Sequence, residues 1–211
     1  EEYINKYDVI YIDFSRLPEN CQTYEEYINR IKAGIKEDIL MLSSTSIESE
    51  IQELIDNDII LTIGSKECAD IVNKLSKKAD KKIRAHIKID TGFGRYGFIY
   101  SDIRTIVETI NSLKDVSIEG MYSHFSLAYY KNNKWTIKQF NRFMEVVEAL
   151  KLNDINIQTL HICNSPAFLN YPNMHLNGAR IGSAFLGRVD ADINVGLKKI
   201  GKLKCSIEEI K

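Results

Sequence analysis

Short apolar runs rich in β-branched residues alternate along the chain with longer stretches in which apolar residues recur every three or four positions. The short runs have the character of buried strands, and the longer stretches have the period of amphipathic helices. We predict seven strands, at Asp8–Asp13, Asp38–Leu42, Ile59–Ile63, Ile83–Asp90, Ile118–Ser123, Gln158–Cys163 and Gly178–Leu186. We predict five helices between them, at Thr23–Lys32, Ile47–Asp56, Lys66–Lys77, Ser101–Leu113 and Thr136–Leu152.

The last of these helices has the clearest apolar stripe. Residues on one helical face repeat at three- and four-residue spacing: Ile137, Phe140, Phe143, Met144, Val147 and Leu150. A stripe of this kind is expected to pack against the sheet.

Alternating strands and helices predict βα units around a parallel sheet. Seven such strands suit either a doubly wound sheet or an eight-stranded barrel that lacks one strand. In both architectures ligands bind at the carboxyl ends of the strands, so the residues that follow each strand are the ones to search.

Composition and charge narrow the class of protein. The chain has 211 residues, of which 44% are hydrophobic and 27% charged, as in an ordinary single-domain globular protein. The 28 Lys and Arg residues nearly balance the 29 Asp and Glu residues, so we expect neither a nucleic-acid partner nor a membrane surface. No leader pattern and no apolar run of about 20 residues is found, and we expect a cytoplasmic location.

The four cysteines show no spacing typical of metal sites or redox pairs. They are scattered along the chain, at Cys21, Cys68, Cys163 and Cys205. We therefore expect reduced thiols and no bound metal.

A charged strand end at Lys88 runs into a turn with three glycines, in the segment 88–98. Glycines allow a close approach of the backbone to a ligand. Lys88 would be buried on a central strand, where an isolated ammonium group is costly. The alternative is an ordinary glycine turn with a surface ion pair.

Three further strand ends carry polar groups. His124 ends an apolar strand, although a histidine there can also be a satisfied core residue. Asn164 and Ser165 follow the next strand and suit an anion, or else form a turn or helix cap. Arg180 lies in an apolar strand just before Gly182 and Ser183, whose amides could bind phosphate.

Arg180 could equally be a structural residue paired with a carboxylate. Taken together, however, the four strand ends predict one small-molecule site for an anionic ligand.

Four of these segments resemble the motifs of the alanine racemase family, in the same order. KIDTGFGRYGF is similar to K-x-D-T-G-M-G-R-x-G, EGMYSHF to E-G-x-x-T-H-F, HICNSPA to H-x-x-N-S-A, and ARIGSAFLG to V-R-x-G-x-x-x-Y-G. The resemblance covers roughly residues 24–211. It implies the (β/α)8 barrel of the family's N-terminal domain, which binds pyridoxal 5′-phosphate.

The resemblance also implies residue roles. Lys88 matches the lysine that is carbamylated in many members, and Arg95 matches the arginine that meets it and orients the substrate carboxylate. His124 matches the histidine beside the cofactor ring, and Arg180 the arginine that faces the pyridine nitrogen. The phosphate-side residues are Asn164, Ser165, Gly182 and Ser183.

The chain also departs from the family pattern. The motif V-K-A-N-A-Y-G-H-G, which carries the family's cofactor lysine, is not found. Tyr7–Ile28 could match the family's opening segment, with the lysine strand missing between Tyr27 and Gly34, and we slightly prefer this alignment. Alternatively, Asp8–Asp13 is the second barrel strand and the chain starts just past the lysine.

Two single positions are also relevant. Lys32 is the one tempting substitute for the cofactor lysine, although a cation in the last turn of a helix is the simpler explanation. Leu186 replaces the usual aromatic residue.

The resemblance implies an amino-acid racemase acting on alanine, with serine as a second substrate, or a fragment of one that is inactive as this chain. The alternative is a non-catalytic scaffold that binds pyridoxal phosphate. An aldolase or decarboxylase is disfavoured by Arg180. We expect the incomplete barrel at residues 1–196, the start of a C-terminal β-domain at 197–211, and a homodimer in the intact protein.

Overall fold

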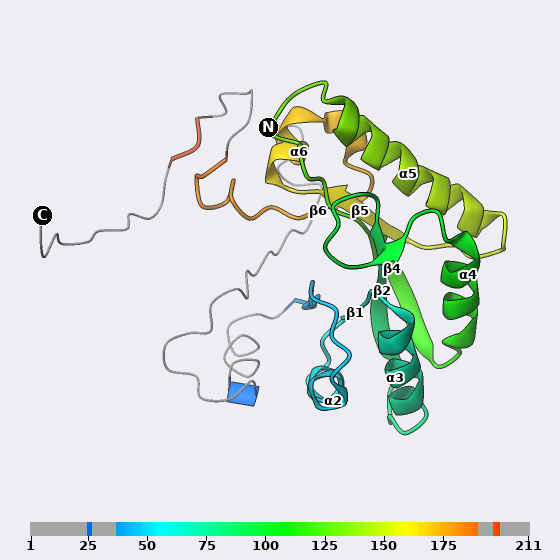
Figure 1. Cartoon of the computed structure of the whole chain (residues 1–211). Helices are drawn as coiled ribbons and strands as arrows, with labels where there is room; N and C mark the ends of the chain where they lie inside the picture. The colour runs from blue at the N-terminus through cyan, green and yellow to red at the C-terminus, as the bar shows by residue number, and fades with distance from the viewer. Residues whose placement is uncertain (1–24, 27–36, 190–195, 199–211) are drawn as a thin grey trace, which may run out of the picture.

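The computed structural model describes residues 25–26, 37–189 and 196–198 (Figure 1). Several predicted features lie outside these residues: the strand Asp8–Asp13, nearly all of the helix Thr23–Lys32, Lys32 itself, Cys21 and Cys205. Neither alignment of the segment before Gly34 is therefore tested.

Helices and strands alternate through the described residues, as the pattern predicts. The strands are β1 (Leu61–Ile63), β2 (Ile83–Asp90), β3 (Phe98–Ile99), β4 (Val116–Tyr122), β5 (Thr159–Cys163) and β6 (Gly178–Ala179). The helices are α2 (Glu48–Asp56), α3 (Lys66–Ser76), α4 (Ile103–Ser112), α5 (Lys134–Lys151) and α6 (Ser165–Asn170), followed by a short 3₁₀ helix η1 (Pro172–Met174).

The strands form one parallel sheet in the order β1-β2-β4-β5-β6, with β3 paired to β2. A bridge between Leu40 and Ile60 adds a further parallel contact beside β1. Along this path each main strand lies next to the main strand that follows it in sequence, so the order never reverses as a doubly wound sheet would require. Right-handed crossovers then place the connecting helices on one face, and Figure 1 shows α3, α4 and α5 together on one side of the sheet.

The strand predictions are accurate for the central strands. Ile83–Asp90 is a strand over the whole predicted range, and β4 and β5 differ from prediction by one or two residues at their ends. The predicted strand Gly178–Leu186 is wrong beyond Ala179, because the chain turns from Gly182 onward. The predicted strand Asp38–Leu42 is reduced to the bridge at Leu40.

The helix predictions are correct to within three residues at each end for α2 to α5, whereas α6 and η1 were missed. Half of the α5 stripe is buried, at Phe143, Val147 and Leu150, and Phe140 and Met144 are partly buried against the same core. Ile137 is an exception, because it is 39% exposed in the first turn of the helix. Within the described part of the chain, no helix is long and apolar enough to cross a bilayer.

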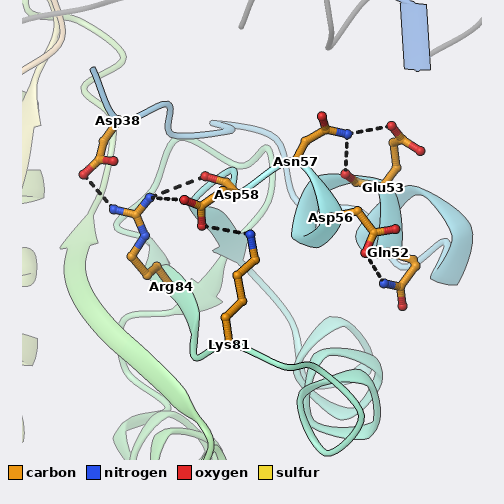
Figure 2. A network of polar contacts seen from close by, with 8 residues as sticks. All are labelled: Asp38, Gln52, Glu53, Asp56, Asn57, Asp58, Lys81 and Arg84. Carbon is orange, nitrogen blue, oxygen red and sulfur yellow. Dashed lines mark hydrogen bonds and ion pairs between the residues drawn. The ribbon is translucent and has the colours of Figure 1, made fainter. Parts of the chain in front are cut away.

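Ion pairs gather at the amino-terminal end of β2, and two amide side chains contact carboxylates at the carboxyl end of α2 (Figure 2). Arg84 lies 2.6 Å from an Asp38 carboxylate oxygen and 3.6 Å from one of Asp58, which also pairs with Lys81 at 3.3 Å. The carboxylate side chains of these pairs are more than half exposed, so each pair contributes at most about 1 kcal/mol. This cluster ties segments together at the edge of the sheet opposite the predicted site.

Candidate functional site

The predicted site residues lie at or just after the carboxyl ends of β2, β4, β5 and β6. Because these strands are parallel, all four ends meet at one edge of the sheet. The backbone amide of Arg180 donates to the Cys163 carbonyl at 2.9 Å, which continues the β5–β6 pairing to the start of the site.

The loop after β2 is closed by the carboxylate of Asp90. Its Oδ1 accepts hydrogen bonds from the amides of Gly92, Phe93 and Gly94 at 2.8, 2.9 and 3.2 Å. Gly97 has φ +124°, and a Cβ there would lie 2.9 Å from the Lys88 carbonyl oxygen, so the turn requires glycine.

This loop carries Arg95. Its guanidinium lies 4.6 Å from the centre of the Phe93 ring and 5.5 Å from that of Tyr96. The loop thus holds the cation against aromatic faces, a favourable arrangement for a guanidinium.

Lys88 is buried, with 2% of its surface exposed. Its Nζ donates to the Ile89 carbonyl at 2.7 Å and lies about 5.5 Å from the ring centres of Tyr96 and Tyr122. Burial, and to a lesser extent the nearby charge of Arg180, lowers the pKa of Lys88 to about 7. The alternative of a surface ion pair is wrong, since Lys88 belongs to none of the ion pairs among the described residues.

Arg180 is 8% exposed and donates hydrogen bonds to several neighbours. Nη1 donates to His161 Nδ1 at 2.7 Å, and Nη2 donates to the Ser123 carbonyl at 2.6 Å and to His124 Nδ1 at 3.2 Å. The guanidinium also lies 5.0 Å from the centre of the Tyr122 ring. Its orientation is therefore fixed by β4 and β5.

His124 lies between this arginine and the glycine loop. Its ring meets the Phe93 ring edge-on at 5.2 Å, and its Nε2 lies 3.4 Å from Asn164 Nδ2. Burial, together with the charges of Arg180, Arg95 and Lys88, lowers the pKa of His124 to about 2. The imidazole is therefore neutral at physiological pH.

Ser165 lies at the first position of α6, whose N-cap is Asn164. Its Oγ accepts hydrogen bonds from the amides of Gly182 at 3.0 Å and Ala184 at 3.2 Å. The two amides therefore gather around the Ser165 hydroxyl oxygen, and backbone amides and a hydroxyl grouped in this way are donors of the kind that bind anions. Sequence reasoning identified Ser165, Gly182 and Ser183 but missed Ala184, because a backbone amide has no residue-type signature.

A cavity of about 570 Å³ opens at this edge. Six of the predicted residues line it, namely His124, Asn164, Ser165, Arg180, Gly182 and Ser183. Lys88 and Arg95 are not among its lining residues. The lining residues that sequence reasoning missed are Tyr129, Pro166, Ile181 and Phe185, and Leu186 also takes part.

Comparison with known proteins agrees with this geometry. The family model "Alanine racemase, N-terminal domain" matches residues 20–189. Among curated proteins, the alanine racemase of Methanococcus maripaludis is 34% identical over 185 residues, which is 85% of this chain and 49% of that protein. The alanine racemase of Clostridium novyi is 34% identical over 186 residues, covering 85% of this chain and 48% of that protein.

Solved structures give the same result. The alanine racemase of Clostridium difficile 630 in complex with cycloserine has a TM-score of 0.73 at 30% identity, over 80% of this chain and 46% of that one. The alanine racemase of Bacillus anthracis with bound L-Ala-P has a TM-score of 0.73 at 27% identity, over 83% of this chain and 46% of that one. The chain spans about half the length of the relatives it matches.

Proposed function

This chain belongs to the alanine racemase family through its N-terminal domain, and from that premise we propose that it is the pyridoxal 5′-phosphate-binding part of an amino-acid racemase. Alanine is the proposed substrate, because the matched relatives are alanine racemases, and serine is the second choice. The observation that carries the proposal is a single cavity lined by an anion-binding group and by a buried arginine.

The phosphate would lie at Ser165 and the amides of Gly182 and Ala184, which are already grouped because both amides donate to the Ser165 hydroxyl oxygen. Ser183 and Asn164 line the same cavity and would complete the phosphate side. An anion that accepts hydrogen bonds from two or three such donors can be bound without a lysine side chain.

Arg180 would face the pyridine nitrogen. Pyridoxal phosphate, when bound, supplies the electron sink that makes the substrate Cα–H acidic. Arg180 stays charged and donates a hydrogen bond without giving up a proton, so it keeps the ring nitrogen unprotonated. A weaker electron sink favours racemisation over transamination or decarboxylation.

His124, neutral and held by Arg180, would lie beside the cofactor ring. Arg95 would orient the substrate carboxylate. Lys88 would act as a carbamate: the nitrogen of its neutral amine bonds to the carbon of CO₂ and one proton is released to solvent, which leaves an anion that Arg95 can pair with through two hydrogen bonds. The low pKa of Lys88 supports this, because only the neutral amine reacts with CO₂.

For the intact protein we propose a homodimer in which the partner's C-terminal domain completes the site. Three large side chains that line the cavity are exposed and would be covered: Tyr129, Phe185 and Leu186. The proposed domain division remains residues 1–196 for the barrel and 197–211 for the start of the C-terminal domain.

Cofactor recognition can be tested with 4′-deoxypyridoxine 5′-phosphate, which lacks the aldehyde and so binds without a lysine bond. We expect the chain to bind it, and Ser165→Asp to weaken binding at least about tenfold, because a carboxylate on the two amides repels phosphate. Calorimetric titration measures both. Ser101→Asp, at an exposed serine outside the site, is the matched control. Equal binding by wild type and Ser165→Asp would refute the phosphate assignment.

The chain by itself is expected to produce no D-alanine from L-alanine. Racemisation needs a proton donor and acceptor on opposite faces of Cα, and the 211-residue sequence has no motif that matches the family's cofactor lysine. Chiral chromatography of the products, with pyridoxal phosphate added, measures this. D-Alanine above the level of a protein-free control would contradict the expectation.

The second candidate is a non-catalytic protein that binds pyridoxal phosphate through the same residues. Binding without any turnover, even after the sequence is extended to family length, would select this alternative.

A further inference from the structure

His86 on β2 and His161 on β5 contact each other across the strand that separates them. Their ring nitrogens, His86 Nδ1 and His161 Nε2, lie 2.9 Å apart, and both residues are at most 7% exposed. In a parallel sheet two strands separated by a third are about 10 Å apart, so side chains between them normally intervene.

Gly120 on β4 makes this contact sterically feasible. It is the register partner of His86, next to a shift in the pairing between Ala85 and His86. A Cβ built on Gly120 would lie 2.4 to 2.6 Å from three atoms of the His86 ring. Its φ lies outside the left-handed region, so the backbone does not demand glycine here. The imidazole does.

His161 is fixed on its other sides by the site. Its ring stacks on Tyr122 at 4.9 Å with an interplanar angle of 13°, and its Nδ1 accepts from Arg180 Nη1 at 2.7 Å. Arg180, which lines the cavity, is thereby joined through His161 to His86.

The direction of these hydrogen bonds follows from the chemistry of the groups. A guanidinium has donors only, so His161 Nδ1 carries no proton and the single proton of the neutral ring is on Nε2. His161 Nε2–H must then donate to His86 Nδ1, which leaves the His86 proton on Nε2. Burial lowers the pKa of both rings, that of His86 to about 4, which keeps them neutral and this order intact.

We infer that His86, held over Gly120, is a positioning residue that orients Arg180 through His161. This inference rests on the proposed function in one respect, namely that Arg180 faces the cofactor. The direction of the hydrogen bonds does not depend on it, because these bonds are present in the chain without ligand. A removed His86 leaves a buried N–H of His161 without its acceptor, which loosens the ring against which Arg180 is aligned.

Two matched variants separate the hydrogen bond from the bulk of the ring. His86→Asn places an amide oxygen close to the former Nδ1 position and keeps an acceptor, whereas His86→Leu fills similar space without one. Gly120→Ala leaves His86 in the sequence but pushes its ring away, so it should behave like His86→Leu. The double variant His86→Leu/Gly120→Ala should lose no more binding affinity than either single variant, because both substitutions break the same hydrogen bond.

The first readout is the proton pattern of the histidine rings, from ¹H–¹⁵N spectra of the ligand-free chain. We expect both His86 and His161 of the wild type to be protonated at Nε2 and bare at Nδ1. The His161 Nε2–H signal should persist in His86→Asn and broaden beyond detection in His86→Leu and Gly120→Ala. Two results would overturn the inference: a wild-type His161 that is protonated at Nδ1, or a His161 Nε2–H signal that is unchanged in His86→Leu.

The second readout is affinity for 4′-deoxypyridoxine 5′-phosphate. We expect His86→Leu and Gly120→Ala to weaken binding roughly tenfold and His86→Asn less than about threefold. Unchanged affinity in His86→Leu would contradict the positioning role. If the wild type does not bind this ligand but shows the expected proton pattern, the proposed function fails while the hydrogen-bond order stands.

Discussion

Lowering the pH from 7 to 5 is expected to destabilise the folded chain by about 6 kcal/mol. Three buried histidines have a lowered pKa: His86 at about 4, His124 at about 2, and His161 well below its usual 6.5, in each case mainly because of burial. At pH 5 each one costs roughly 2 kcal/mol, since the unfolded chain binds a proton that the folded chain does not. The sum is comparable to the whole stability of a typical domain.

The sign follows from proton counting. Between pH 4 and pH 6.5 the unfolded state binds more protons than the native state, so the free energy of unfolding rises with pH. Urea denaturation at a series of pH values should give a slope approaching about 4 kcal/mol per pH unit near pH 5. His86→Asn, which removes one of the three groups, should reduce that slope by about one third. A free energy of unfolding that does not change from pH 7 to pH 5 would refute the assignment of these three histidines as buried and neutral.

Replacing Lys88 by Met is expected to stabilise the folded chain by about 3 kcal/mol at pH 7 in buffer free of CO₂. Burial lowers the pKa of Lys88 from 10.5 to about 7, which at pH 7 favours the protonated unfolded state by roughly 4 kcal/mol. Loss of the hydrogen bond to the Ile89 carbonyl offsets about 1 kcal/mol. Methionine fills similar volume without a charge, and urea denaturation measures the difference.

Two controls make the Lys88 result specific. Lys74→Met removes a lysine whose ion pair with Glu48 is half exposed, and it should change the stability by less than about 1 kcal/mol. Between pH 7 and pH 10.5 the unfolded wild type holds a proton that folded Lys88 has lost, so wild-type stability rises with pH and Lys88→Met lacks this contribution. A loss of stability in Lys88→Met at pH 7 would show that Lys88 is stabilised as a charged group.

Much of the fold could be predicted because its strands are short apolar runs between clear turn signals. Ile83–Asp90 is the best example. The error at Gly178–Leu186 has a physical cause: Ile181, Phe185 and Leu186 have the composition of a strand, but here they line a cavity whose backbone turns at Gly182. Apolar composition alone does not distinguish these two uses.

Part of the site could be predicted because its groups follow strand ends, which parallel pairing brings to one edge. The contacts of His161 could not, because its partners His86, Tyr122 and Arg180 come from three other strands or strand ends. Gly120 belongs to the EGMYSHF segment, but the segment does not reveal why glycine is needed at this position. The need for glycine there arises from a ring on a neighbouring strand, which only the sheet register reveals.

The loop that Asp90 closes also bears on the entropy of ligand binding. Three amide hydrogen bonds to one carboxylate hold the chain from Gly92 to Gly94, and Arg142 on α5 donates to the Thr91 carbonyl at 2.9 Å. Ordering a residue costs about 1 to 2 kcal/mol, and here that cost is met during folding. Arg95 therefore lies in a loop that is ordered before any ligand binds. A ligand that contacts Arg95 loses little binding free energy to the ordering of this loop.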